Sequence, residues 1–266
     1  MIDDWIRQLI DRHTRVFTRA EFLRSVRALS ARYVERRSEL PDRPPLDSPG
    51  KRAAFAGFYA PLHLLTAHAI GHALGPPSHL PLETIDLGCG TGAASAGWAL
   101  AATERPKLVG IDRLSWPLGE AAWNWTTLGL SGETRRGDLV GTAARMVHDQ
   151  IRDRRPSRPI ARHVMLGWTV NELDPDSRRR LLESLLAMAA SGSSALVIEP
   201  LARRATPWWE EWRDALAPFG VRSDEWRFEI TLPAVLAELD REAGFRREGL
   251  TAKSLWIAPR PALDEV

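Results

Sequence analysis

The chain has 266 residues and an apolar fraction typical of a globular protein, which fits one large domain or a domain with an appendage. Its formal charge is only +2, and its basic residues are almost all arginine. The sequence has no long basic run that would indicate nucleic-acid binding. The single cysteine, Cys89, excludes an internal disulfide and any all-cysteine metal or iron–sulfur site.

Residues 1 to about 37 are expected to form a helical cap, because apolar side chains recur there at helical spacing. Thr18 followed by Glu21 is a capping-box pattern that predicts the start of a second helix. The arginines of that helix are Arg24, Arg27, Arg32, Arg36 and Arg37. They indicate a solvated basic face, or alternatively a lid over a site or an RNA-binding arm.

A proline-rich stretch, Ser38–Gly50, is the predicted linker. The expected division is a cap and linker at 1–50, one domain at 51–258 and a tail at 259–266. The segment 51–75 should be one helix, or two broken near Pro61.

Three histidines lie in segment 51–75. His68 and His72 share a helix face, but no third ligand stands at a usable spacing, so no metal site is predicted.

The stretch from Glu83 to Asp112 predicts a buried strand, a glycine-rich turn, a helix and a second strand that ends on an acid. The glycines let the backbone turn tightly and approach a ligand closely. Gly88 to Ala93 also satisfies G-x-G-x-x-A, so spacing alone does not exclude NAD. No Lys-Ser/Thr follows, which argues against a phosphate loop of the NTPase type.

The order Asp-Leu-Gly-Cys-Gly-Thr-Gly at 86–92 resembles motif I of class I S-adenosylmethionine (SAM) methyltransferases, in which an acid stands two residues ahead of the first glycine. The resemblance implies a Rossmann-like α/β sheet of order 3-2-1-4-5-7-6 with strand 7 antiparallel. It also implies SAM as methyl donor and S-adenosyl-L-homocysteine as product. The residues assigned to SAM in and after this loop are Asp86, Gly88, Cys89, Gly90, Thr91, Asp112 and Arg113.

Within that resemblance Asp86 would accept from the SAM ammonium, the loop amides would bind its carboxylate, and Asp112 would bind the ribose hydroxyls. Trp116 is expected near the adenine ring. Asp138, after the third strand, would accept from the adenine amine, with the backbone N–H of Leu139 beside it.

The fourth strand, His163–Val170, leads into Asn171 and Glu172. Because ligands bind at the carboxyl ends of parallel strands, Gly167 and Trp168 should lie beside the transferred methyl group. Asn171 would position the acceptor and Glu172 would act as a base, or both residues simply begin a turn before the helix at Pro175.

Helices that precede the first strand often cover the SAM pocket in this enzyme class. Tyr59 and Arg52 are therefore expected at the carboxylate end of the cofactor. His63 is the candidate for substrate contact or for a general base.

Residues 201–230 are interpreted as an insertion after the fifth strand, Ser194–Pro200. The insertion would overhang the acceptor and set specificity through Trp208, Trp209, Trp212 and Trp226, although ordinary helix packing explains them equally well. The closing helix is expected at 232–243 and the last strands at 245–250 and 254–257.

The strings FYAPLH, NELDPDSRRRLLESL and VIEP, with the glycine loop between them, are similar to the small-ribosomal-subunit methyltransferase-like family over roughly residues 51–200. Members of that family usually carry a cysteine cluster thought to hold an iron–sulfur cluster. This chain has Asp-Glu-Trp-Arg-Phe at 224–228 in the comparable place. The resemblance therefore supports the fold and cofactor more than the substrate.

Three functions are compatible with these features. The first is methyl transfer to a nitrogen or oxygen of an enclosed small molecule. The second is methylation of RNA, ribosomal RNA in particular, and the third is a ribosome-associated factor that holds SAM without turnover. We expect a cytoplasmic protein with no membrane contact, since no signal sequence or long apolar run stands out.

Overall fold

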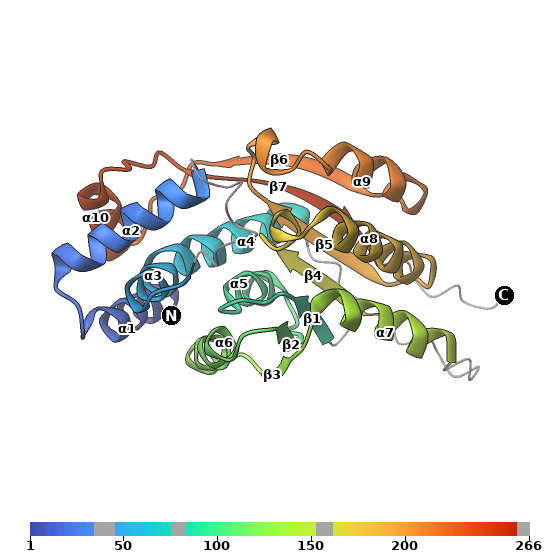
Figure 1. Cartoon of the computed structure of the whole chain (residues 1–266), viewed down its shortest axis with the longest axis horizontal. Helices are drawn as coiled ribbons and strands as arrows, with labels where there is room; N and C mark the ends of the chain where they lie inside the picture. The colour runs from blue at the N-terminus through green and yellow to red at the C-terminus, as the bar shows by residue number, and fades with distance from the viewer. Residues whose placement is uncertain (35–45, 76–82, 153–161, 260–266) are drawn as a thin grey trace.

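The computed structural model describes residues 1–34, 46–75, 83–152 and 162–259 (Figure 1). These contain a seven-stranded sheet of order β3-β2-β1-β4-β5-β7-β6. The strands are β1 Glu83–Leu87, β2 Lys107–Asp112, β3 Gly132–Arg136, β4 His163–Gly167, β5 Ser194–Glu199, β6 Arg222–Phe228 and β7 Leu250–Ile257. Strands β1 to β5 pair in parallel, and β7 runs antiparallel to both β5 and β6. The predicted fold class and strand order are confirmed.

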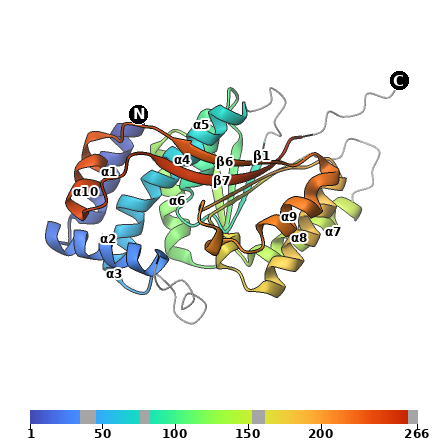
Figure 2. The ribbon, with the colours of Figure 1, turned by 90° about the horizontal axis from the view of Figure 1, so that it is seen from above.

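Helices cover both faces of the sheet, as Figure 2 shows. One face carries α4 Ala60–Leu74, α5 Ala93–Ala101 and α6 Ser115–Thr127, and the other carries α7 Leu139–Arg152, α8 Pro175–Ala190 and α9 Trp209–Leu216. An outer layer on the α4–α6 side consists of α1 Ile2–Thr14, α2 Arg19–Val34, α3 Pro49–Ala54 and α10 Ala234–Ala243.

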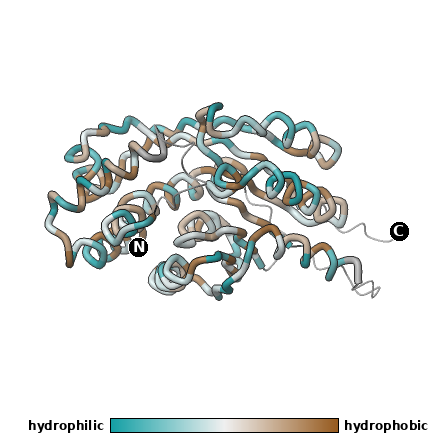
Figure 3. Tube along the Cα trace, in the orientation of Figure 1, coloured by the Kyte–Doolittle hydropathy of each residue, from teal (hydrophilic) through white to brown (hydrophobic). Residues whose placement is uncertain are grey.

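The central strands β4 and β5 are mostly apolar because both faces of the sheet are covered (Figure 3). Side chains alternate between two cores: Val164 of β4 packs with α7 and α8, whereas Met165 packs with α4 and α5. The N-terminal helices α1 and α2 share a hydrophobic core with α3 to α6 and α10. The N-terminal cap therefore packs in the same hydrophobic core as the helices of the main domain.

The predicted capping box forms at the start of α2. Thr18 N donates to Glu21 Oε2 at 2.8 Å, and Glu21 N donates back to Thr18 Oγ1 at 3.3 Å. Arg19 then binds Glu238 and Glu242, which attaches α2 to α10. Residues 35–45, with Arg36, Arg37 and most of the predicted linker, lie outside the described residues, as do the side chain of Arg32 and the tail beyond residue 259.

Pro61 does not break the helical segment. Helix α3 continues through a π-helical turn, η2 Phe55–Tyr59, into α4. Ala60 N donates to Phe55 O, so the wider turn comes immediately before the proline, which has no N–H to donate.

The helix Pro49–Leu74 is 26 residues long, and by length and composition it qualifies as a membrane span. The expectation that no apolar run is long enough is therefore wrong. In the most apolar part, 67% of the helix is buried inside the protein, which is the pattern of a core helix.

The prediction of two strands at 245–250 and 254–257 is wrong in part. Strand β6 is formed by Arg222–Phe228, and residues 245–249 form no strand. Helix α10 lies between β6 and β7. The segment inserted into the expected order of strands and helices is therefore 229–249, between the last two strands, and not 201–230. Strand β6 is the edge strand of the sheet, and its charged residues, four of its seven, concealed it in the sequence.

Candidate cofactor and acceptor site

The glycine loop follows β1 and is fixed to the end of β2. Gly88 N and Cys89 N both donate to Ile111 O, at 2.8 and 2.9 Å. Gly88 has φ 75°, and a Cβ placed there would lie 2.4 Å from Thr169 Cγ2. Gly90 has φ 51°, but a Cβ there would meet nothing within 4 Å. The loop therefore packs tightly on its Gly88 side and is open at Gly90.

Asp112 at the end of β2 holds the same loop. Its Oδ2 accepts from Gly90 N at 3.1 Å and its Oδ1 accepts from Leu114 N at 2.9 Å. Each carboxylate oxygen has a second lone pair, so Asp112 retains capacity for ligand hydroxyls. Asp112 therefore has a structural role in holding the loop, and this geometry is also compatible with the ribose binding predicted for it.

Asp86 is buried at the end of β1, and its Oδ2 has no hydrogen-bond partner among the described residues. Burial, together with the nearby charge of Asp112, raises the pKa of Asp86 to about 7, although hydrogen bonding from Ser95 opposes part of the shift. A buried carboxylate oxygen without a partner is costly. A cationic ligand would satisfy it, so the residues present fit the ammonium group of SAM.

Asp138 stands at the predicted place after β3, and it caps α7. Its Oδ2 accepts from Gly141 N at 2.7 Å, and Leu139 is the buried first residue of the helix. The side chain of Asp138 is exposed. Its contact with adenine stays a prediction.

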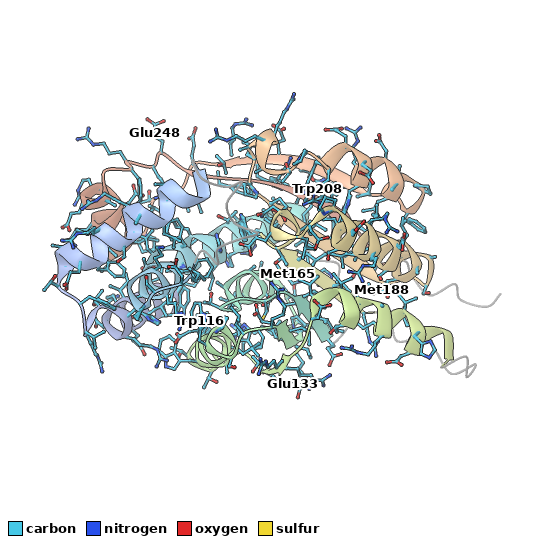
Figure 4. All side chains as sticks on the ribbon, in the orientation of Figure 1. Trp116, Glu133, Met165, Met188, Trp208 and Glu248 are labelled. Carbon is cyan, nitrogen blue, oxygen red and sulfur yellow. The ribbon has the colours of Figure 1, made fainter. Side chains whose placement is uncertain are left out.

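Trp116 lies in the first turn of α6, between α6 and α3 (Figure 4). The guanidinium carbon of Arg52 from α3 is 5.7 Å from the centroid of its ring. The indole Nε1 is buried and lacks a hydrogen-bond partner within the described ranges. Arg113 is exposed, and its carbonyl accepts from Arg136 Nε at 3.1 Å. The structure thus brings Arg52 and Trp116 together.

Trp168 follows β4 with φ 56°, a conformation that is uncommon and strained for a bulky residue. Its ring stacks on His63 of α4, with centroids 4.0 Å apart and planes 8° from parallel. Burial lowers the pKa of His63 to about 3, so the imidazole is neutral at pH 7 and a weak base. His63 is therefore better suited to orienting a ligand than to removing a proton.

A pocket of about 280 Å³ opens beside this aromatic pair. Its lining residues are Tyr59, Leu62, His63, Thr66, Trp168, Arg247, Gly249, Leu250 and Thr251. Tyr59 Oη donates to Val26 O of α2 at 3.2 Å, so the pocket wall is fixed to the N-terminal cap.

Arg247 enters the pocket from the segment before β7. Asp240 of α10 accepts from its backbone N at 2.8 Å and also binds its guanidinium. The guanidinium carbon lies 5.2 Å from the ring centroid of Phe58 and 4.7 Å from that of Phe245. Sequence reasoning missed Arg247 because this segment was interpreted as a strand.

Asn171 and Glu172 form a short 3-10 turn after Trp168, but their side chains have different environments. Glu199 at the end of β5 is fully buried; it accepts from Asn171 N at 3.1 Å and from Asn171 Nδ2. Glu172 is exposed. Asn171 is therefore held in place by Glu199, whereas Glu172 faces the surface.

The tryptophans of the supposed insertion do not line the pocket. Trp208, Trp209 and Trp212 are buried with α8 in the core on the α7–α9 side, where Figure 4 labels Trp208. Trp226 stacks on Phe228 in the edge strand, with centroids 5.4 Å apart. The prediction that residues 201–230 cover the acceptor is wrong for α9, and the pocket is instead bordered by the end of the segment 229–249.

His68 and His72 lie close together, with Nε2 atoms 3.2 Å apart. In the part of the chain that the structure describes, no third candidate ligand joins them.

No protein-family model matches the sequence, and no curated protein matches it either. The narrower resemblance to the small-ribosomal-subunit family therefore stays a prediction. Solved structures do resemble the fold. A SAM-dependent methyltransferase from Agrobacterium tumefaciens is 16% identical with a TM-score of 0.48, over 75% of this chain and 63% of that one.

Two further structures are similar. A mitomycin 7-O-methyltransferase is 16% identical with a TM-score of 0.47, over 90% of this chain and 66% of that one. A SAM-dependent methyltransferase from Aquifex aeolicus is 15% identical with a TM-score of 0.44, over 83% and 96%. At these identities and TM-scores the likeness does not extend to substrate or reaction.

Proposed function

We propose that this protein is a SAM-dependent methyltransferase that transfers a methyl group to a nitrogen or oxygen of a small molecule enclosed in the pocket beside Trp168. The observation that carries the proposal is the buried Asp86 oxygen without a partner, at the end of β1 and next to a glycine loop whose Gly90 side is open. This combination suits a ligand that has an ammonium and a carboxylate on one carbon.

The cofactor would be held by groups at the ends of three strands, β1, β2 and β3. Asp86 would accept from the ammonium. The amides of Gly88, Cys89 and Gly90 already donate within the protein, so the carboxylate would lie at the open Gly90 side of the loop without relying on these three donors. Asp112 would bind the ribose, with Trp116 and Asp138 at the adenine. When bound, SAM supplies a methyl group already activated by its sulfonium charge.

The pocket supports an acceptor without net charge. The positive charge of Arg247 is balanced by Asp240, and His63 is neutral at pH 7. The stacked pair of His63 and Trp168 forms a flat aromatic wall, which favours a planar acceptor. At about 280 Å³ the space suits a ligand smaller than the usual drug-sized occupant.

Catalysis would then depend on position and on exclusion of water. Asn171, fixed through two hydrogen bonds to Glu199, would orient the acceptor atom. The proposal needs no strong base, in keeping with the low pKa of His63.

The intramolecular contacts of three arginines in the N-terminal cap favour a small-molecule acceptor rather than RNA. Arg12 pairs with Glu120, Arg19 pairs with Glu238 and Glu242, and Arg27 donates to Glu242 O. These three arginines serve contacts within the chain, which leaves them less available to phosphate groups.

The test is transfer from methyl-labelled SAM to two pools, a low-molecular-mass cell extract and total RNA. We expect label in the small-molecule pool, and its loss in Asn171→Ala with SAM binding retained. Arg179→Ala, on the exposed outer side of α8, is the matched control and should leave transfer unchanged. Label only in RNA, with binding that weakens steeply with salt, would replace the proposal by an RNA methyltransferase. SAM binding without label in either pool would indicate a binding factor.

A further inference from the structure

Helix α6 supplies two buried donors to the glycine loop. Asn124 Nδ2 donates to Thr91 O and Trp125 Nε1 donates to Gly92 O, both at 2.9 Å. Two successive carbonyls at the end of the loop are thereby fixed. Trp125 also fills the space next to Gly92, where a Cβ would lie 2.6 Å from its Nε1.

The amide of Asn124 is oriented in turn by Trp5 of α1. Trp5 Nε1 donates to Asn124 Oδ1 at 2.9 Å, across 119 positions of sequence. An indole N–H is only a donor and a backbone carbonyl is only an acceptor. The amide therefore has one arrangement that satisfies both partners, and the hydrogen bonds run in one direction from Trp5 through Asn124 to Thr91.

This chain of hydrogen bonds is closed to water. Trp5 is 1% exposed and Asn124 is 0% exposed. If Trp5 lost its N–H, the Asn124 oxygen would be left buried without its donor, which is more costly than the loss of an exposed hydrogen bond. The amide would then be free to turn, and Thr91 O would lose its fixed donor.

A second contact holds α1 against the same face of α6. His13 Nε2 and Arg12 both bind the carboxylate of Glu120, at 2.9 and 3.1 Å. Burial alone would raise the pKa of Glu120, but the hydrogen bonds from His13 and Arg12 outweigh it and the pKa is lowered. Glu120 and Asn124 are four residues apart, so they present one face of α6 to α1.

We propose that Trp5 is a positioning residue for the cofactor loop, so that α1 is part of the SAM site and not a separate cap. The inference rests on the proposed function for its ligand, but the hydrogen-bond chain belongs to the protein alone. Because coupling between two sites is reciprocal, SAM binding also strengthens the docking of α1.

The experiment compares Trp5→Phe with Trp226→Phe. Both changes replace an indole with a phenyl ring and remove one N–H donor, since Trp226 Nε1 donates to Ser254 Oγ at 2.8 Å in the edge strand. Calorimetry with SAM should show affinity at least about fivefold weaker in Trp5→Phe, and unchanged in Trp226→Phe. In an Asn124→Ala background Trp5→Phe should have no further effect, because Trp5 acts through Asn124.

A second measurement needs no ligand. The amide of Gly92 donates to Cys89 O inside the loop, at 2.8 Å. Its hydrogen exchange in the ligand-free protein should be faster in Trp5→Phe and unchanged in Trp226→Phe. If the wild type binds no SAM but this exchange still responds to Trp5→Phe, the proposed function fails and the positioning role stands.

The inference is overturned if Trp5→Phe binds SAM as tightly as the wild type with unchanged Gly92 exchange. It is also overturned if both tryptophan variants weaken binding equally, or if Trp5→Phe and Asn124→Ala act additively. Each of these results would make Trp5 a packing residue only.

Discussion

The burial of Asp86 should make the stability of the protein depend on pH. Its pKa is about 7 in the fold and near 3.9 in an unfolded chain, so the folded state binds more protons between these values. The stability of the ligand-free protein should therefore fall as pH rises from about 4 to 7, with ionised Asp86 costing on the order of 4 kcal/mol.

Asp86→Asn removes this titration. We expect the free energy of urea unfolding of the variant to gain on that of the wild type as pH rises from 4 to 7, and the difference to level off above pH 7. Parallel pH profiles for the two proteins would contradict the assigned environment of Asp86.

Two glycines of the loop should respond differently to the same substitution. In Gly88→Ala the new Cβ would lie 2.4 Å from Thr169 Cγ2 at φ 75°, so overpacking adds to backbone strain and stability should fall by about 2–4 kcal/mol. Gly90→Ala has strain alone, about 1–2 kcal/mol, because a Cβ there meets nothing within 4 Å.

The added methyl group of Gly90→Ala would enter the open side of the loop, where the ligand is expected. Thermal unfolding and calorimetry on both variants check this pair. We predict that Gly90→Ala stays folded and binds SAM more weakly than the wild type. Equal affinity would show that the open side of the loop is not a binding surface.

At the scale of elements, α9 is a core helix and not a wall of the pocket. Trp212 is 1% exposed, and its ring centroid is 4.7 Å from that of Trp208. Trp212→Ala should lower stability by about 3–5 kcal/mol through the lost burial and the cavity left behind.

The affinity of folded Trp212→Ala for SAM should match that of the wild type. Chemical unfolding measures the first effect, and calorimetry well below the unfolding transition measures the second. A variant of wild-type stability with impaired SAM binding would contradict the core role of α9 and place the helix against the SAM site.

The elements that the sequence predicted well are the repeated βα units. In β1, β2, β4 and β5 an apolar run is followed by a turn and a helix, and burial on both faces makes that signal strong. Strand β6 lacks this signal because it lies at the sheet edge and most of its residues are charged or polar. The helix α10 was recognised, but not its place between the last two strands.

On the scale of the whole molecule, local patterns predict the loop at 86–92 and the acids at 86 and 112, because these groups lie within one βαβ unit, β1-α5-β2. The candidate acceptor pocket is only partly predictable, since Tyr59, His63, Trp168 and Arg247 meet through tertiary packing. The contact between Trp5 and Asn124 spans 119 positions and leaves no local sequence signal. Distant contacts of this kind pack the N-terminal helices against the helices that cover the sheet.

The central claim is that SAM binds between Asp86 and the glycine loop. It is tested most directly by calorimetric titration of SAM into the wild type and into Asp86→Asn, which keeps the size of the side chain and removes its charge, at a pH above 7. We predict one binding site in the wild type and at least a tenfold loss of affinity, about 1.4 kcal/mol or more, in the variant. Equal affinities in the two proteins, or no binding by the wild type, would contradict the claim.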